Sequence, residues 1–286
     1  MRLARLALVF AVSMVCALGG AAPAEAAGSS GWIGDRGEKL LGDDTLAVHV
    51  LVPLCDNDQI DCGSTRAGDP DDLGHNLYWG AVFGHKRFFS RKASTFSLLS
   101  TTTEAGGTLE RSVFRKTTSG KPFGRDKEVE VILILDAIHG GSIDDAVDRF
   151  YREAERGAWI HFKQGLKSRS VRADVVGYAG HNRMMDGKKP PPKQKEDKKA
   201  GAPIDSFVLA CDSNGYFKVP LEERGSRPLL LTSALMAPEG YVLEAVVEGL
   251  TRNESRTLIR KRTVAAYAKW QNITEKTAGP IFAKLD

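Results

Sequence analysis

This sequence of 286 residues has no large net charge of either sign. The 40 lysines and arginines nearly balance the 36 aspartates and glutamates, which gives a formal net charge of +4 at pH 7. No arginine-rich helix and no stripe of aromatic and basic residues is present, so we expect no nucleic-acid partner. The Pro/Lys tract at 187–203 is the main basic run, and its polarity predicts a flexible, solvated loop.

Long apolar runs are scarce as well, apart from one at the N-terminus. Two arginines lie at its start, apolar residues continue from Leu6 to about Leu18, and small residues then lead to Ala26. A membrane-spanning helix needs about 20 apolar residues, whereas this shorter order is typical of a secretory signal peptide. We therefore predict a signal peptide at 1–26, cleaved after Ala26, and a linker at 27–44. The mature protein would be exported, either periplasmic or secreted, with no membrane span.

Cysteine is rare, with four residues in the whole chain. Cleavage of the signal peptide would remove Cys16 and leave Cys55, Cys62 and Cys211. Cys55 and Cys62 close the short loop CDNDQIDC, and we expect them to pair in the oxidising compartment that an exported chain meets. Cys211 is then the odd cysteine, which is either a free thiol with a function or an inert buried residue.

Histidines and acidic residues show no metal-ligand spacing. The acidic loops DNDQID and GDPDD lack the spacing and the final glutamate of an EF-hand. His49, His75 and His85 have no spacing typical of a zinc site. We therefore expect neither a metal nor another cofactor.

Apolar segments of strand length alternate with helical patterns along the rest of the chain. Buried strands are predicted at 45–56, 128–137, 171–180, 205–212 and 227–236, with two edge strands or a hairpin at 94–103 and 107–118. Helical patterns lie at 71–92, 142–157, 238–250 and 254–273, the second one capped by Ser142 and ended by Gly157. This order predicts one α/β domain at 45–286, a three-layer sandwich with a mostly parallel central sheet.

Two of these strands end in reactive residues. DVVGYAGHNRMMD leads into His181, and SFVLACDS leads into Cys211. Sites in parallel sheets lie at the carboxyl ends of strands, so the two side chains face one cleft if the strands are neighbours. A thiolate nucleophile needs a nearby imidazole and backbone N–H groups that stabilise the oxyanion. The N–H of Cys211 and those of the turn Gly180–Asn182 are candidates.

These segments resemble the caspase-like cysteine peptidases, which include metacaspases, paracaspases, gingipains and legumain. VVGYAGHNRMMD is similar to the metacaspase-type strand that ends Y-S/A-G-H-G, and SFVLACDSNGYF to the strand that carries the nucleophile. PLLLTSALMAPEGYVLEAVVEGL resembles the next strand and helix, so the resemblance covers about residues 45–250. It implies a caspase-like fold and peptide-bond hydrolysis, with His181 as general base and Cys211 as nucleophile. Because metacaspase-like members accept Lys or Arg, Asp186 or Asp212 would line an acidic substrate pocket.

Several alternatives stay open. Asn182 stands where the family has glycine, so a catalytically inactive caspase-like domain, acting as an envelope binding or scaffold protein, is a second hypothesis. An exported α/β protein of unrelated function is a third. ILDAIHGG offers a rival base, His139, but we interpret this residue as the cap of a strand-to-helix turn. The expected partner is a peptide or protein substrate, and the sequence leaves the oligomeric state undecided.

Overall fold

The computed structural model describes residues 44–103, 107–194 and 201–285. The predicted signal peptide at 1–26 and the linker up to residue 43 lie outside these ranges. Residues 195–200 of the predicted loop 187–203 lie outside them too, and the described parts of that loop contain no helix or strand. No helix in these ranges is long and apolar enough to cross a membrane.

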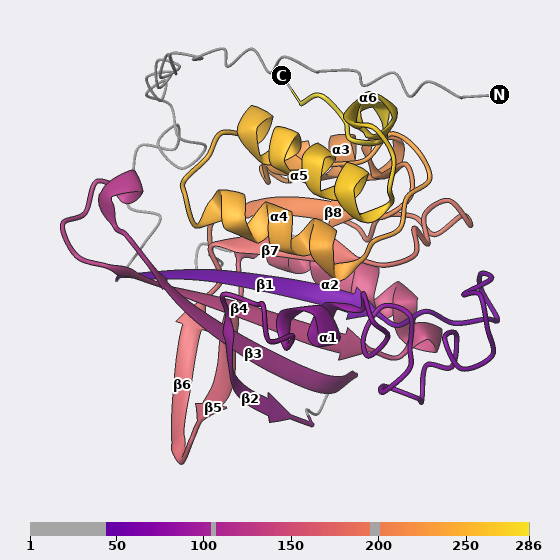
Figure 1. Cartoon of the computed structure of the whole chain (residues 1–286). Coiled ribbons are helices and arrows are strands. Elements are labelled where there is room, and N and C mark those ends of the chain that lie inside the picture. The colour runs from indigo at the N-terminus through magenta and orange to yellow at the C-terminus, as the bar shows by residue number, and fades with distance from the viewer. Residues whose placement is uncertain (1–43, 104–106, 195–200, 286) are drawn as a thin grey trace, which may run out of the picture.

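A seven-stranded sheet, in the order β2-β3-β4-β1-β7-β8-β9, forms the centre of the molecule (Figure 1). Five neighbouring strands are parallel, namely β4 (Val129–Ile138), β1 (Thr45–Pro53), β7 (Val175–Ala179), β8 (Asp205–Leu209) and β9 (Pro228–Leu230). At one edge β3 (Thr108–Thr118) runs antiparallel to β4, and β2 (Ser97–Thr102) antiparallel to β3. The structure confirms the mostly parallel sheet and the predicted hairpin at its edge.

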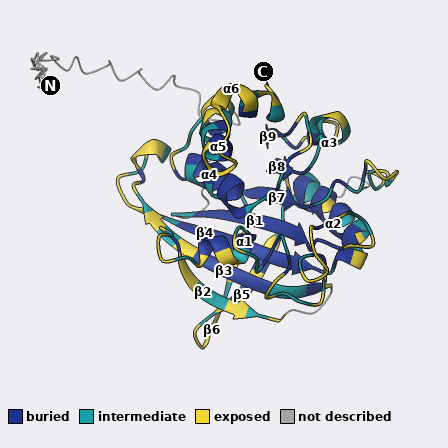
Figure 2. Ribbon diagram, turned by 45° about the vertical axis from the view of Figure 1, so that its right-hand side comes forward, coloured by how far each residue is buried: buried dark blue, intermediate teal, exposed yellow. Residues whose placement is uncertain are grey.

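Helices cover both faces of this sheet, so the domain has three layers (Figures 1 and 2). One face carries α1 (His85–Phe89), α4 (Gly240–Leu250) and α5 (Arg256–Trp270), followed by the short α6 (Glu275–Ala278). The other face carries α2 (Ile143–Arg156) and α3 (Ser213–Glu222). The α/β class predicted from the alternating pattern is therefore confirmed.

The central strand β1 shows why its sequence is continuously apolar. Val48, Val50 and Val52 pack in the core cluster that contains α4 and α5, whereas Leu51 packs in the cluster that contains α2. A parallel strand covered by helices on both faces buries its side chains, and these four residues are fully buried. Figure 2 shows β1 in the dark blue of buried residues. His49, also fully buried, is the polar exception in this strand.

Helix α2 begins and ends within one residue of the predicted bounds. Ser142 is the N-cap residue, although its side chain makes no capping hydrogen bond, and Asp144 and Asp145 lie in the first turn. Carboxylates are favourable there because the amino end of a helix carries partial positive charge. Gly157 ends the helix with φ of 70°, a left-handed value that favours glycine.

The helix expected at 71–92 is wrong over most of its length, because only α1, at its end, is helical. Asn76 holds the preceding chain in turns: its side chain accepts from the Cys55 N–H at 3.1 Å and donates to the Cys55 carbonyl at 2.8 Å. Gly80 packs so tightly that a Cβ there would lie 2.2 Å from the Leu73 carbonyl oxygen. These long-range contacts override the helical spacing of the apolar residues.

Two elements have no counterpart among the predicted ones. A hairpin of β5 (Trp159–Gln164) and β6 (Lys167–Arg172) projects from the sheet (Figure 1), and α3 follows Cys211 directly. Strand β5 alternates exposed and buried positions, whereas most positions of β6 are exposed. As a result, the predicted strand at 171–180 is divided between the end of β6 and β7.

The predicted disulfide between Cys55 and Cys62 is present, and both half-cystines are buried. It closes the loop directly after β1. Cys211 is the free cysteine of the described residues.

Candidate active site

The segments that carry His181 and Cys211 lie side by side. Strands β7 and β8 pair in parallel with Ala179 opposite Leu209, and each reactive residue lies two positions beyond that pair. The Gly180 N–H donates to the Leu209 carbonyl at 3.1 Å, which continues the pairing past the strand ends. Because neighbouring strands lie about 4.8 Å apart, both residues occupy the same stretch of the carboxyl edge of the sheet.

The imidazole of His181 is oriented by a carboxylate. Its Nε2 lies 2.5 Å from Oδ2 of Asp186, and the side chain is 12% exposed. The Tyr178 hydroxyl donates to the His181 carbonyl at 2.8 Å and fixes the backbone. When Asp186 accepts the Nε2 proton of a neutral ring, Nδ1 carries the lone pair and can act as a base.

Asp186 therefore has a different environment from the predicted substrate pocket. Besides His181, it contacts Nη1 of Arg183 at 3.5 Å. Asp212, the other predicted pocket residue, is the N-cap residue of α3 and has a left-handed φ of 43°. Its N–H donates to the Ala234 carbonyl at 3.0 Å, and the residue is partly exposed. An acidic pocket formed by these two residues stays a prediction.

The thiol of Cys211 lies against the chain between β9 and α4. The Met236 N–H donates to Sγ at 3.4 Å, and Sγ lies 3.6 Å from the Met236 carbonyl oxygen. A backbone N–H aimed at sulfur stabilises a thiolate, whereas the carbonyl accepts the proton of a thiol. The same residue can thus support both protonation states.

Two buried phenols lie near this thiol, and neither was predicted as a site residue. Burial raises the pKa of Tyr78, and the charges of Cys211 and Glu239 add to the rise. Burial also raises the pKa of Tyr267, while the Ala237 N–H donates to its hydroxyl at 3.2 Å. Both phenols stay neutral at physiological pH, so Cys211 is bordered by uncharged groups on this side. Tyr78 belongs to the segment misread as a helix, and no sequence pattern links it to Cys211.

The predicted oxyanion donors fall into two groups. The Gly180 N–H is occupied by Leu209, but the structure records no acceptor among the described residues for the N–H groups of Cys211 and Asn182. Asn182 is fully buried, and its Nδ2 donates to the Cys211 carbonyl at 2.6 Å. Its Oδ1 accepts from the Met184 N–H at 3.1 Å. The asparagine thus joins the turn after β7 to the turn that bears the thiol.

The chain matches no family model, no curated protein and no solved structure.

The rival base, His139, is a capping residue, as predicted. It follows β4, which β1 and β7 separate from β8. Its Nδ1 accepts from the Gly141 N–H at 3.0 Å, at the start of the short 3-10 turn Gly140–Ser142 before α2. The ring is therefore hydrogen-bonded within its own turn, and strands β1 and β7 separate β4, which precedes it, from β8, which precedes Cys211.

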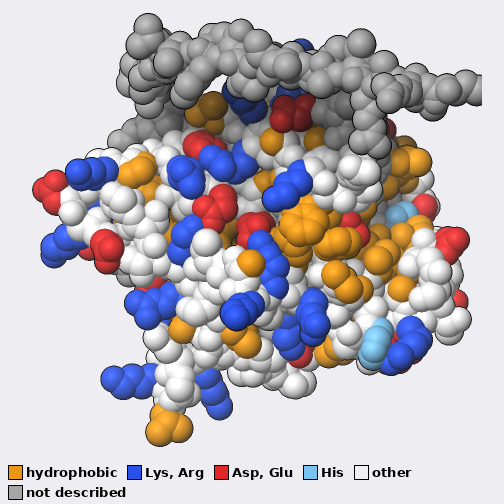
Figure 3. Space-filling model, in the orientation of Figure 1, with side chains coloured by type: hydrophobic (Ala, Val, Ile, Leu, Met, Phe, Trp, Pro, Cys, Tyr) orange, Lys and Arg blue, Asp and Glu red, His pale blue; other side chains and the backbone are white. Residues whose placement is uncertain are grey.

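The surface at the carboxyl ends of the strands is apolar. Figure 3 shows hydrophobic side chains gathered on the side of the molecule toward which β1 points. Two exposed residues, Met185 and Leu235, directly precede Asp186 and Met236, which contact the two reactive residues. Such a surface suits an extended peptide with apolar side chains.

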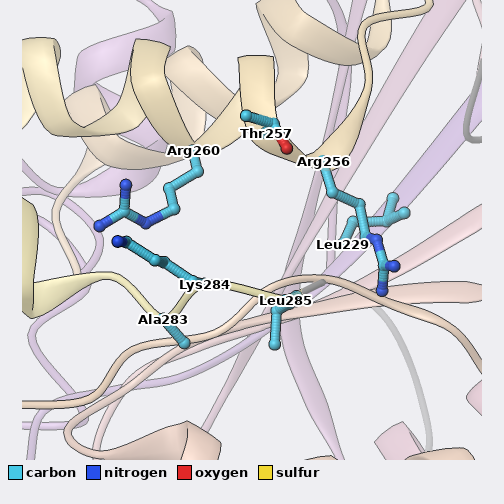
Figure 4. A pocket seen from close by; sticks show the side chains of 7 residues that line it. All are labelled: Leu229, Arg256, Thr257, Arg260, Ala283, Lys284 and Leu285. Atoms are coloured by element: carbon cyan, nitrogen blue, oxygen red, sulfur yellow. The ribbon is translucent and has the colours of Figure 1, made fainter.

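A hollow of about 110 Å³ lies between α5 and the C-terminal segment, lined by Leu229, Arg256, Thr257, Arg260, Ala283, Lys284 and Leu285 (Figure 4). The guanidinium of Arg260 donates from Nε to the Phe282 carbonyl at 2.8 Å and from Nη2 to the Gly279 carbonyl at 2.6 Å. These bonds fasten the C-terminal segment to α5, which is a structural role. The described ranges contain no group of three or more His, Cys, Asp or Glu residues able to hold a metal ion.

Proposed function

We propose that this protein is an exported caspase-like cysteine endopeptidase that uses a His181–Cys211 dyad. The observation that carries the proposal is the shared position of the two residues beyond the paired ends of β7 and β8, with His181 oriented by Asp186. The strand order supports it as well. Strands β2, β3 and β4 lie on one side of β1, and the later strands β7, β8 and β9 lie on its other side. Sites in such sheets form where the strand order reverses, which is here beside β7.

In this mechanism Nδ1 of His181 accepts the thiol proton of Cys211. The thiolate, supported by the Met236 N–H, attacks the carbonyl carbon of the scissile peptide bond. The N–H groups of Cys211 and Asn182 stabilise the oxyanion of the tetrahedral intermediate. The imidazolium then protonates the leaving amine, and water hydrolyses the acyl-enzyme to release the second product and restore the thiol.

The experiment is alkylation of the mature protein by iodoacetamide from pH 5 to 9. Because Cys55 and Cys62 are joined, Cys211 is the free thiol that reports. An activated thiolate reacts well below the free-thiol pKa of about 8.5, and His181→Ala removes this reactivity. His139→Ala, the matched control, leaves it unchanged. A thiol that is inert at every pH, or that reacts identically without His181, refutes the dyad.

A catalytically inactive caspase-like binding protein is the second candidate. It is favoured by the Met236 carbonyl near Sγ, which accepts the proton of a neutral thiol. It is also favoured by the Asn182 side chain, which is hydrogen-bonded to the Cys211 carbonyl and joins the two turns that bear His181 and Cys211. This candidate predicts a Cys211 that reacts only near its ordinary pKa and no cleavage of a peptide library. Activated alkylation together with peptide cleavage would rule it out.

A further inference from the structure

A cluster of buried charges lies on the sheet face that carries α2, away from the candidate active site. Its centre is His49 on β1, which is fully buried. Nδ1 lies 2.7 Å from Oε2 of Glu153, and Nε2 lies 3.0 Å from Oδ2 of Asp136. Burial by itself lowers the pKa of His49, but the charges of Glu153 and Asp136 outweigh it and raise the pKa. The ring therefore lies between two carboxylates that both favour its protonated form.

Two arginines complete the cluster. Arg111, on β3, donates from Nε and Nη2 to the two carboxylate oxygens of Asp136, each at 2.7 Å. Arg149, on α2, donates to Asp136 at 2.7 Å and to Glu153 at 2.8 Å. Two carboxylates thus face two guanidinium groups and the His49 ring.

A hollow of about 480 Å³ opens above this cluster. Its lining consists of Thr108, Arg111, Arg149, Arg152, Glu153, Arg156 and Gly157. A spacing of three and four residues places the three α2 arginines on one face of the helix. A second hollow, of about 320 Å³, shares Arg149 and Arg152 and continues along α2 to Ser142, with Asp145 as its acidic member.

Arg152 adds a further guanidinium group to the lining of the hollow. It is exposed, and its guanidinium has no ion pair or hydrogen bond with any residue that the structure describes. The neighbouring Arg149 is held in place by Asp136, Glu153 and a 2.9 Å bond to the Thr108 hydroxyl. The hollow therefore combines two guanidinium groups that are fixed by hydrogen bonds, those of Arg111 and Arg149, with the available guanidinium of Arg152.

The lining of the hollow holds four arginines and one glutamate, so an anion bound there would lie among guanidinium groups. Guanidinium groups bind phosphate and carboxylate through paired hydrogen bonds, which matches an arginine-lined hollow. A volume near 480 Å³ lies within the range of about 300–1,000 Å³ that small-ligand sites occupy.

We propose that this arginine-lined hollow binds a small ligand with at least two negative charges on phosphate or carboxylate groups. The site is independent of the dyad, because Cys211 contacts Met236, which belongs to the core cluster on the α4 and α5 face. Failure of the peptidase proposal would therefore leave this site standing, and the reverse also holds.

The test is calorimetric titration of the mature protein with pyrophosphate at low ionic strength, with citrate in a parallel arm. We expect pyrophosphate to bind and Arg152→Gln to weaken it about tenfold, since a hydrogen bond to a charged group contributes that much. Arg252→Gln, an exposed arginine in the turn after α4, is the matched control and leaves the affinity unchanged. If pyrophosphate binds more tightly than citrate, the site is assigned to phosphate ligands. If citrate binds more tightly, the site is assigned to carboxylate ligands.

Arg149→Lys provides the second variant. It keeps the charge but loses the paired geometry, and we expect it to weaken pyrophosphate binding as well. Thermal unfolding of each variant without ligand shows whether the fold is retained. The proposal is overturned if neither pyrophosphate nor citrate binds to the unmodified protein, or if the Arg152→Gln and Arg252→Gln variants bind with equal affinity.

Discussion

Replacing Asp136 by asparagine removes the negative charge that holds the buried cluster together. The Asp136 carboxylate is completely buried and accepts hydrogen bonds from Arg111, Arg149 and His49. Burial by itself raises the pKa of Asp136, but the charges of His49 and Arg111 outweigh it and hold the pKa well below its usual range. Asparagine keeps the shape, but it leaves two guanidinium groups and the His49 ring around a neutral amide, whose NH2 group is itself a donor.

The size of the loss follows from this environment. Removing one partner of a buried ion pair costs about 3–5 kcal/mol, because the remaining charges stay buried without compensation. For a domain of this size, each 1 kcal/mol lowers Tm by about 2–4 °C, so we expect Asp136→Asn to melt roughly 6–20 °C lower.

Urea unfolding at pH 7, followed by circular dichroism, measures the free energy directly. The matched control is Asp72→Asn, which breaks a surface pair with Arg66, whose side chain is 67% exposed. Such exposed pairs contribute little to the free energy of unfolding. If Asp136→Asn loses no more stability than Asp72→Asn, the cluster does not stabilise the fold as argued.

Three further predictions concern other groups. The pKa of His49 is raised in the folded protein, so its contribution to stability is complete below its unfolded pKa of about 6.5 and is lost as pH rises through the folded pKa. The free energy of unfolding, measured against pH, should therefore fall over this range relative to that of His49→Gln. A free energy that stays constant over this range would contradict the stabilising role of His49. Asp186→Asn should slow alkylation of Cys211 at pH 6 by about threefold to tenfold, because the variant loses the hydrogen bond that orients His181. Asp212→Asn, the control, should leave the alkylation rate unchanged. Equal rates in the two variants would refute an orienting role of Asp186. Cys55→Ser should lower the free energy of unfolding by about 2–3 kcal/mol, the loop-closure contribution of so short a loop, and a loss below 1 kcal/mol in urea would count against it.

Local patterns were sufficient for much of the architecture. Continuous Val, Leu and Ile runs predicted β1 and β4, because a strand buried on both faces needs apolar side chains at every position. The left-handed Gly157 and the acidic first turn predicted the ends of α2. The short spacing of Cys55 and Cys62 predicted their disulfide. Each of these features depends on residues close together in the chain.

The candidate site was predictable in part. The sequence placed His181 and Cys211 at strand ends, but the neighbouring positions of β7 and β8 come from the sheet. Asp186 was expected in a substrate pocket, and only the folded turn after β7 brings it to the imidazole. Tyr78, whose pKa is raised in part by the charge of Cys211, belongs to a segment more than a hundred residues earlier, and no local pattern predicts that proximity.

The amino-acid sequence by itself determined the class of this protein, an α/β domain with reactive residues at the ends of buried strands. Only the tertiary structure decided which distant charges meet. His49, Asp136, Arg111 and Glu153 come from different strands and a helix, and each looks like an isolated polar residue in an apolar or amphipathic pattern. They stay buried because the charges compensate one another, and such compensation depends on distances in space that spacing along the chain does not contain.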